Sequence, residues 1–211
     1  MMGSTIRRGT LIVLEGCDRS GKSTQARMLV DSLTQEGHPS KLMRFPDRTT
    51  TLGKTINDYL TSAVEMSDQA IHLLFSANRW EAMKQMEADL NAGTTLVVDR
   101  YAFSGVAFTA AKGLDLQWCK NPDTGLYAPD VTIYMDLPVD EAMRRGGFGE
   151  ERYEKEDFQN KVGQVFMQLR TPEWKIVDAS PSIDSVHTTL LDIAKTTIDR
   201  AAKSPLQRLQ W

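Results

Sequence analysis

The sequence is poor in the residues that build disulfides and metal centres. Its 211 residues include two cysteines, Cys17 and Cys119, and three histidines, His38, His72 and His187. Two thiols so far apart form no disulfide framework, which fits a reducing compartment. The cysteines and histidines also lack the close spacing of a metal-ligand cluster. We therefore expect a fold that needs neither a disulfide nor a metal staple.

Long hydrophobic runs and an excess of positive charge are also missing. The apolar run Leu11–Leu14 ends at Glu15, too early for a signal sequence or a membrane span. The 25 Lys and Arg residues are outnumbered by 28 Asp and Glu residues, so a broad nucleic-acid-binding surface is not expected. We expect a cytoplasmic protein, with nucleus or organelle left open, and neither a nucleic-acid nor a membrane partner. One local basic pocket for a polyanion is compatible with this balance.

What is present suffices for one globular domain over residues 1–211. A chain of this length buries about 70% of its extended-chain surface on folding, and its length favours one domain over two. Hydrophobic residues make up 41% of the sequence and charged residues 25%, which is ordinary for a globular protein.

Short apolar runs alternate with longer amphipathic stretches along the chain. The expected strands are Thr10–Glu15, Ser40–Arg44, Thr94–Asp99, Val131–Leu137 and Trp174–Asp178. The expected helices are Lys22–Glu36, Leu52–Thr61, Asp68–Asn91, Phe103–Lys112, Asp140–Arg144, Glu154–Leu169 and Ser182–Lys203. The runs TLVVD and VTIYMDL are apolar enough to be buried on both faces, as in a parallel sheet. The alternation predicts an α/β fold, a doubly wound five-stranded parallel sheet flanked by helices.

Two segments interrupt this alternation. Asn121–Pro129 is expected to be a loop. Arg144–Tyr153 reads RRGGFGEERY and is rich in glycine and arginine. From composition alone, the second segment is as compatible with an exposed surface loop as with a functional element.

The strongest motif is GCDRSGKS at Gly16–Ser23, which satisfies the phosphate-binding pattern G-x-x-x-x-G-K-[ST]. It follows an expected strand and precedes an expected helix, as its mechanism requires. Gly16 and Gly21 allow the backbone to curl so that its N–H groups converge on phosphate oxygens. Lys22 is placed to reach the β- and γ-phosphates, and the Ser23 hydroxyl suits Mg²⁺. The motif predicts a nucleoside triphosphate site.

Inside this loop, Asp18 places a negative charge beside an anion cradle. One interpretation is that the neighbouring Arg19 simply pairs with it. In the other, Arg19 lies along the phosphoryl group in transfer, where an arginine is worth roughly 10³–10⁵ in rate. Asp18 would then accept a hydrogen bond from a sugar hydroxyl of a second substrate.

Two further groups follow the ends of expected strands, where ligands collect in such folds. Asp99 ends LVVD, the position of a metal-proximal carboxylate, and Arg100 follows it. An Asp-Arg pair at such a place can also be only a local ion pair. Arg48, in the segment FPDR after the second strand, is a candidate fork for phosphate or a solvated loop arginine.

Phe75 and Arg79 lie four residues apart in HLLFSANRWE and so share one face of a helix. A flat heterocycle could stack on Phe75 while Arg79 donates to an edge oxygen. The alternative is that Phe75 belongs to the core and Arg79 covers the surface.

Taken together, these segments resemble the thymidylate kinases of the eukaryotic type. The resemblance is carried by LIVLEGCDRSGKSTQ, RFPDR, LLFSANRWE, TLVVDRYAFSGVAFT, FGEERYE and WKIVDAS, and it covers nearly the whole chain. It implies a P-loop fold with a short lid at about 144–153 and transfer of the γ-phosphoryl group of ATP to thymidine 5′-monophosphate (dTMP), a step of dTTP biosynthesis. It also implies Mg²⁺ as cofactor and a homodimer.

The resemblance assigns roles to residues that match the family's motifs. The implied catalytic residues are Arg19, Lys22 and Asp99. The implied ATP-binding residues are Gly16, Arg19, Ser20, Gly21, Lys22, Ser23, Thr24, Arg145, Ser180 and Pro181. The implied dTMP-binding residues are Asp18, Arg48, Phe75, Arg79, Arg100, Phe108 and Tyr153, with Tyr153 packed against C2′ of the sugar. Ser23 and Asp99 would lie by the metal.

Other functions stay open at this point. A GTP-hydrolysing switch would share the phosphate loop, but no guanine-reading N-K-x-D follows a late strand, since the segment 160–163 reads NKVG. A nucleotide-binding protein without catalysis is opposed by the intact Arg19, Lys22 and Asp99. A broader pyrimidine (deoxy)nucleoside monophosphate kinase is also compatible, because one methyl group in an apolar pocket is worth only about 1–3 kcal/mol.

Overall fold

A computed structural model describes residues 8–145 and 151–211 of the chain. Its centre is a five-stranded sheet in the order β2-β3-β1-β4-β5, and all its pairings are parallel. The strands are β1 Leu11–Glu15, β2 Ser40–Arg44, β3 Thr95–Asp99, β4 Val131–Asp136 and β5 Lys175–Asp178. The prediction of a parallel, doubly wound sheet is confirmed.

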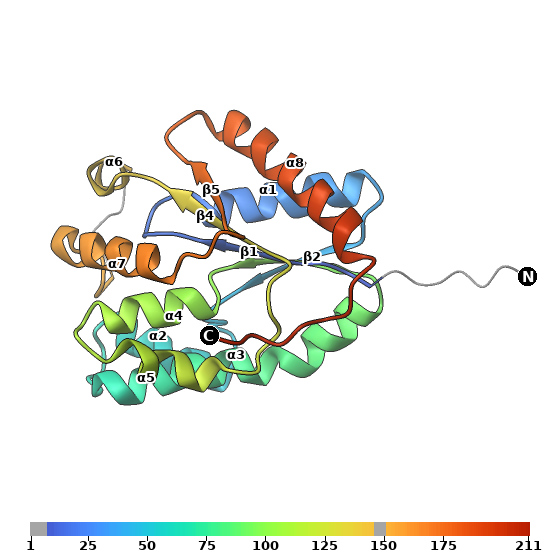
Figure 1. Ribbon diagram of the computed structural model, residues 1–211. Coiled ribbons are helices and arrows are strands. Elements are labelled where there is room, and N and C mark those ends of the chain that lie inside the picture. The colour runs from blue at the N-terminus through green and yellow to red at the C-terminus, as the bar shows by residue number, and fades with distance from the viewer. Residues whose placement is uncertain (1–7, 146–150) are drawn as a thin grey trace, which may run out of the picture.

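Helices connect the strands and cover both faces of the sheet (Figure 1). Their bounds are α1 Lys22–Gln35, α2 Thr51–Leu60, α3 Asp68–Asn91, α4 Ala102–Ala110, α5 Leu116–Lys120, α6 Val139–Arg144, α7 Glu156–Leu169 and α8 Ile183–Ala201. α1 and α8 lie on one face, and α3, α4 and α7 lie on the other. Within the described residues, no helix has the combination of length and hydropathy needed to cross a membrane.

The apolar strands explain this layering. Every residue of β1 and β3 is buried, because both strands lie inside the sheet and are covered on both faces. Alternate side chains of β1 belong to two separate hydrophobic cores. Leu11 and Val13 pack in the core under α3, α4 and α7. Ile12 and Leu14 pack in the core under α1 and α8. β2 lies at the edge of the sheet and is largely exposed, which its polar sequence SKLMR allows.

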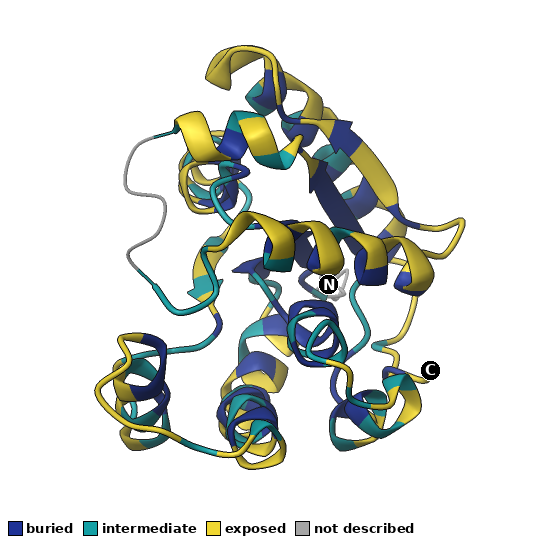
Figure 2. Ribbon diagram, turned by 90° about the vertical axis from the view of Figure 1, so that its left-hand side faces the viewer, coloured by how far each residue is buried: buried dark blue, intermediate teal, exposed yellow. Residues whose placement is uncertain are grey.

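Strand order places a binding crevice at one end of the sheet. From β1 the chain passes to β2 and β3 on one side, and β4 pairs with the opposite edge of β1. In open α/β sheets, ligands bind outside the carboxyl ends of strands where the order reverses in this way. Figure 2 views the molecule from that side, and the buried strands lie behind half-buried loops.

Some sequence predictions need correction or fall outside the description. Helix α5 was not expected, and a 3₁₀ turn at Asn121–Asp123 lies within the segment predicted to be a loop. Asp115 caps α5 by accepting a hydrogen bond from the Trp118 amide, a signal that the sequence did carry. Residues 146–150 of the expected lid lie outside the described residues.

The C-terminal segment packs on the loop that follows α5. The Leu209 amide donates to the Leu126 carbonyl at 2.7 Å, and the Leu209 carbonyl accepts from the Gly125 amide at 3.0 Å. The Trp211 ring packs edge-on against Phe103. The loop that carries Asp123 into the site is therefore held by backbone hydrogen bonds from the end of the chain.

Candidate active site

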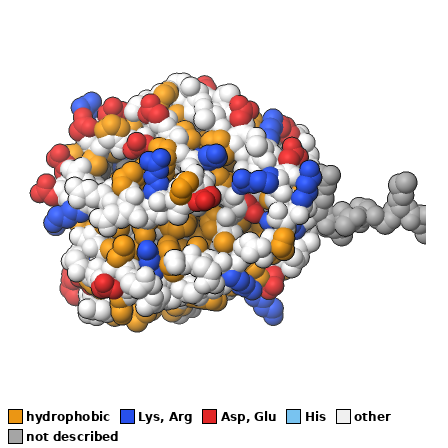
Figure 3. Space-filling model, in the orientation of Figure 1, with side chains coloured by type: hydrophobic (Ala, Val, Ile, Leu, Met, Phe, Trp, Pro, Cys, Tyr) orange, Lys and Arg blue, Asp and Glu red, His pale blue; other side chains and the backbone are white. Residues whose placement is uncertain are grey.

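A cavity of about 830 Å³ lies at the carboxyl ends of the strands. Its wall joins the phosphate loop to α3, α4 and the segment after β5. The lining includes the apolar side chains of Phe45, Phe75 and Phe108 and the basic side chains of several arginines. On the neighbouring face of the molecule, drawn in Figure 3, hydrophobic and charged side chains are likewise intermixed. A concave site with apolar walls and convergent charged groups is typical of a small-molecule pocket.

The phosphate loop begins with a glycine that no other residue could replace without strain. Gly16 has φ 146°, and a Cβ added there would lie 2.7 Å from the Met135 carbonyl oxygen. Gly21, with φ 92°, is the N-cap of α1. The loop therefore passes close to β4 and leads directly into the N-terminus of α1. A helix N-terminus favours a bound anion.

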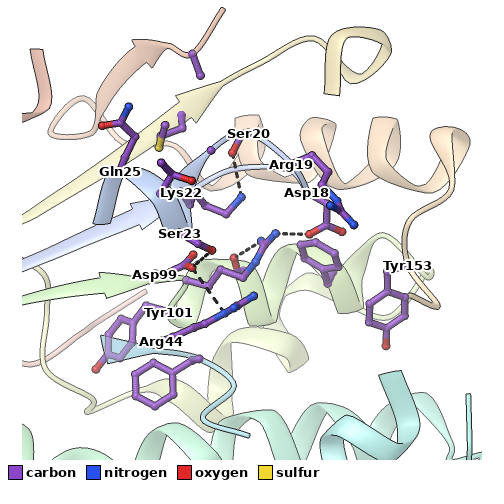
Figure 4. A pocket seen from close by; sticks show the side chains of 18 of the residues that line it. Asp18, Arg19, Ser20, Lys22, Ser23, Gln25, Arg44, Asp99, Tyr101 and Tyr153 are labelled. Carbon is purple, nitrogen blue, oxygen red and sulfur yellow. Dashed lines mark hydrogen bonds and ion pairs between the residues drawn. The ribbon is translucent and has the colours of Figure 1, made fainter. Parts of the chain in front are cut away.

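Lys22 is buried, and its ammonium group turns back onto the loop. Nζ donates to the Cys17 carbonyl at 2.5 Å and to Ser20 Oγ at 3.0 Å (Figure 4). Burial lowers the pKa of Lys22 to about 8 because the site disfavours an uncompensated ammonium. A phosphate group in the loop would supply the missing negative charge.

Ser23 and Asp99 meet at the base of the cavity. Ser23 Oγ donates to Asp99 Oδ2 at 2.5 Å, and Arg44 Nε lies 3.7 Å from the same carboxylate oxygen (Figure 4). In the described residues there is no cluster of three or more His, Cys, Asp or Glu side chains that could hold a metal by itself. A hydroxyl and a carboxylate beside a phosphate loop nevertheless fit Mg²⁺, which takes one or two protein oxygens together with substrate phosphates.

Arg19 and Arg100 both adopt left-handed backbone conformations, with φ 63° and 67°. Such conformations cost on the order of 1–3 kcal/mol at non-glycine residues and are concentrated at functional sites. Arg19 Nε donates to Glu154 Oε1 at 3.0 Å. Arg100 forms an ion pair with Asp18, and its Nη1 donates to the Gly16 carbonyl at 3.0 Å. Asp99–Arg100 is thus not the local ion pair that the sequence left open.

The second oxygen of the Asp18 carboxylate is also engaged. Gln159, on α7, donates from Nε2 to Asp18 Oδ2 at 2.6 Å and accepts from the Asp18 amide at 2.8 Å. The same Nε2 donates to the Tyr153 carbonyl at 3.0 Å. Gln159 therefore links the phosphate loop to the end of the segment 144–153.

A fully buried carboxylate, Glu15, supports Arg100 from behind. Its Oε1 accepts from the amides of Tyr101 at 3.0 Å and Ser104 at 3.1 Å, and the Ser104 hydroxyl donates to Oε2. Burial raises the pKa of Glu15 despite these donors. Ser104 also accepts from Arg100 Nη1 at 3.1 Å, so Glu15 anchors the first turn of α4 to the arginine beside the cavity.

Phe75 and Arg79 both line the cavity, as one helix face requires. Phe75 is only half-buried, so one side of its ring is available to a ligand. The Arg79 side chain is 2% exposed and does not cover the surface. It forms a two-point ion pair with Asp123, with Nη2–Oδ2 at 2.7 Å and Nε–Oδ1 at 3.1 Å. Ser76 donates to the same Asp123 carboxylate at 2.7 Å.

Aromatic rings close the side of the cavity near α4. Tyr153 stacks on Phe158 with ring centroids 5.3 Å apart, and Phe108 lies 5.7 Å from Tyr153. The Arg100 guanidinium lies over the Phe108 ring at 5.1 Å. Phe108 and Tyr153 both line the cavity, in agreement with the prediction that they lie together there.

Arg48 is an ion-paired residue rather than a solvated loop arginine. Its Nη2 contacts both oxygens of Glu151, at 2.8 and 3.0 Å, and its Nη1 donates to Asn57 at 3.0 Å. The side chain lines the cavity. The carboxylate of Glu151 thus occupies the Nη2 side of the Arg48 guanidinium.

Two residues assigned to ATP from the sequence, Arg145 and Pro181, line the far end of the cavity. Arg145 donates from Nη2 to the Ala179 carbonyl at 2.8 Å, and its Nη1 donates to the Arg19 carbonyl at 3.2 Å. Pro181 lines the cavity beside them. Ser180 is not part of this wall: it is exposed, and its amide donates to Asp178 at 2.9 Å.

Several residues of the site were not singled out from the sequence, among them Asp123, Gln159, Lys112 and Arg44. Asp123 and Gln159 are partners of predicted residues, and Lys112 contacts Tyr153 from outside the cavity. Arg44 lines the cavity with a half-exposed side chain. Only Arg44 carried a usable signal, because a basic residue at the end of a strand in such a fold faces the ligand edge.

Comparison with known proteins identifies relatives of the whole chain. The family model for thymidylate kinase matches residues 14–190. The human thymidylate kinase is 50% identical over 207 residues, covering 96% of this chain and 98% of the relative. The Arabidopsis thaliana thymidylate kinase is 48% identical over 97% of this chain and 78% of the relative. The structure of the Candida albicans thymidylate kinase superposes with a TM-score of 0.86 at 42% identity, covering 96% of this chain and 99% of that chain.

Proposed function

This chain belongs to the thymidylate kinase family, and we propose that the cavity at the carboxyl ends of its strands holds ATP and dTMP end to end. The protein is an ATP-dependent kinase that phosphorylates dTMP to thymidine diphosphate. The observation that carries the arrangement is the continuity of the cavity from Lys22 in the phosphate loop to Phe75 and Arg79 on α3. A phosphate loop at one end and a stacking face at the other suit two different nucleotides.

In this proposal the phosphate loop holds the donor. The loop amides between Gly16 and Thr24 bind the phosphates, and Lys22 exchanges its contacts with the loop for the β- and γ-phosphates. Arg145 and Pro181 form one wall of the adenine site. Support comes from the buried ammonium of Lys22, which lies at the phosphate loop and lines the cavity.

The acceptor binds at the opposite end. Phe75 stacks on the thymine, and Arg79 directs its remaining N–H groups to the carbonyl edge of the base, because Asp123 already occupies Nε and Nη2. Asp18 accepts from the 3′-hydroxyl of the sugar. Arg48 and Arg100 hold the 5′-phosphate, with the phosphate displacing Glu151 from Arg48.

Transfer then needs positioning and charge compensation more than covalent help from the protein. Arg19 projects from the phosphate loop and stabilises the charge on the phosphoryl group in transfer. The acceptor phosphate is already largely ionised, so Asp99 has no obligatory role as a proton acceptor. Ser23 and Asp99 are the residues that would hold Mg²⁺, which would supply positive charge to offset that of the donor phosphates.

Three finer features follow from family membership. We expect a homodimer, and the exposed Leu73 and Trp80, two turns apart on α3, provide apolar surface for it. We expect the cytoplasm as the compartment. We also expect preference for dTMP over other monophosphates, although the Candida albicans relative is described as having broad substrate specificity.

The arrangement is tested by separating the two binding events. Calorimetry should give one site for dTMP and one for a non-hydrolysable ATP analogue with Mg²⁺. Lys22→Met should weaken the ATP analogue and spare dTMP, whereas Phe75→Ala should do the reverse. Loss of both ligands from either variant, in protein that keeps its melting temperature, would contradict the end-to-end arrangement.

A further inference from the structure

Lys112 lies just beyond the end of α4, and its ammonium group is enclosed in a polar cluster. Nζ donates to Tyr153 Oη at 2.7 Å, to Asp68 Oδ1 at 2.8 Å and to Tyr59 Oη at 3.3 Å. The side chain is only 12% exposed. An ammonium group has three protons, so these three partners use its full donor capacity and fix its position.

The cluster joins four parts of the fold that are far apart in sequence. Tyr59 lies on α2, Asp68 begins α3, Lys112 follows α4 and Tyr153 precedes α7. The ammonium nitrogen lies 4.7 Å from the centre of the Tyr153 ring and 5.5 Å from that of Tyr59. Cation–π attraction therefore adds to the hydrogen bonds.

Tyr153 is the one member of this cluster that also lines the nucleotide cavity. Its backbone carbonyl is fixed by Gln159, and its ring is packed between Phe158 and Phe108. The hydroxyl at the far end of the ring has Lys112 as its donor. Burial raises the pKa of Tyr153, so this group is a neutral phenol throughout the physiological range.

We propose that Lys112 is a positioning residue that holds the Tyr153 ring against the sugar site and thereby enforces selection of deoxyribose over ribose acceptors. The proposal rests on the proposed dTMP site and on the expectation, drawn from the family resemblance, that Tyr153 packs against C2′ of the sugar, where a hydroxyl would collide with its ring. Steric exclusion requires a wall that does not yield, since a ring free to tilt would admit the extra oxygen. Lys112 supplies that rigidity from outside the cavity and without contact with the substrate.

The test compares kcat/KM for dTMP with kcat/KM for ribothymidine 5′-monophosphate in five variants, of which Lys112→Arg is the conservative one. Lys112→Met keeps the length of the side chain but removes its donors, and Tyr153→Phe keeps the ring but removes the acceptor. The double variant combines the two changes. Lys195→Met is the control, because Lys195 also forms an ion pair, with Glu36 at 2.7 Å, but lies on α8.

Misplacement of a positioning group by about 1 Å can cost up to 10²-fold, so we expect the dTMP preference to fall by about tenfold in Lys112→Met and Tyr153→Phe. The double variant should show no further fall, because each change breaks the same contact. Lys112→Arg should restore most of the preference, and Lys195→Met should match the wild type.

Three results would overturn the proposal. They are an unchanged preference in Lys112→Met with an unchanged melting temperature, additive losses in the double variant, or an equal loss in Lys195→Met. Failure of the proposed function looks different, because the wild-type protein would then not phosphorylate dTMP.

Discussion

Arg79 and Asp123 form a two-point ion pair inside the protein, with Nη2–Oδ2 at 2.7 Å and almost no solvent access to either side chain. The aspartate approaches from a 3₁₀ turn 44 residues further along the chain, and the C-terminal segment holds the loop behind it. The pair fixes the plane of the Arg79 guanidinium. The N–H groups that Asp123 leaves unused therefore face the cavity in one fixed direction, and the guanidinium offers the cavity no acceptor. In the proposed acceptor site, this arrangement would favour a base with a carbonyl at that edge over one with an amino group.

Asp123→Asn should therefore weaken both folding and acceptor recognition. Leaving a buried arginine without its counter-charge costs about 3–5 kcal/mol of unfolding free energy. dTMP affinity should fall about tenfold or more, since a misaligned binding group loses an order of magnitude readily. Denaturant titration and calorimetry measure the two effects. The control is Asp89→Asn on the surface, whose pair with Lys41 should be worth at most about 1 kcal/mol; equal losses in the two variants would refute the special role of Asp123.

Arg19→Ala should lower kcat and leave dTMP binding intact. An arginine that stabilises the transferring phosphoryl group contributes roughly 10³–10⁵ in rate. Rapid-quench measurement of the chemical step, with calorimetry of dTMP, separates the two effects. Arg27→Ala, an exposed arginine on α1, is the matched control and should keep wild-type turnover. Normal turnover with weakened dTMP binding would show that Arg19 belongs to the acceptor site.

Phe75→Ala should weaken dTMP without unfolding the domain. Stacking of a base on an aromatic ring is worth about 1–3 kcal/mol, which corresponds to a loss of affinity of about 5- to 150-fold. Phe75→Leu fills most of the same space without a flat face, so it should bind dTMP nearly as weakly as Phe75→Ala. A collapsed melting temperature in both variants, or full affinity in Phe75→Leu, would show that the residue serves packing instead.

Protonation of His72 should make the fold sensitive to mild acid. His72 is buried, with Nε2 donating to the Cys119 carbonyl at 2.9 Å and Nδ1 accepting from the Thr109 hydroxyl at 2.8 Å. Burial and the nearby Arg79 lower the pKa of His72 below its ordinary value of 6.5. The unfolded chain therefore binds this proton more readily, so the stability that neutral His72 provides is present above pH 6.5 and lost as pH falls below it.

The measurement is the free energy of unfolding at pH 7 and at pH 5.5. One proton contributes up to about 1.4 kcal/mol per pH unit. His72→Gln keeps a donor for Cys119 but cannot titrate, so it should lose less stability than the wild type over this interval. An identical pH dependence in the two proteins would assign the acid sensitivity to other groups.

The sequence predicted best where local chemistry alone determines the structure. The buried strands β1 and β3, the glycines of the phosphate loop and the shared helix face of Phe75 and Arg79 follow from periodicity and spacing. The short helix α5 was missed because five residues carry too little periodicity to be seen, although Asp115 is a good N-cap.

Partners brought together by tertiary structure could not be predicted. The sequence offered the adjacent Arg19 as the ion-pair partner of Asp18, whereas the structure pairs Asp18 with Arg100, which lies 82 residues away. Gln159 and Asp123 are separated from their partners by 141 and 44 residues. Ser180 was carried over by resemblance, and the structure leaves it exposed in the turn after β5 and outside the cavity lining.

The most direct test of the account is ADP release from Mg·ATP in the presence of each of dTMP, dUMP, UMP, dCMP, dGMP and AMP. The account predicts rapid turnover with dTMP, slower turnover with dUMP, because one methyl group is worth only about 1–3 kcal/mol, and little with the others. Equal activity with dCMP would contradict the recognition of a carbonyl edge by Arg79. No ADP release with any acceptor, in protein that binds ATP, would contradict the conclusion that this site transfers phosphate to dTMP.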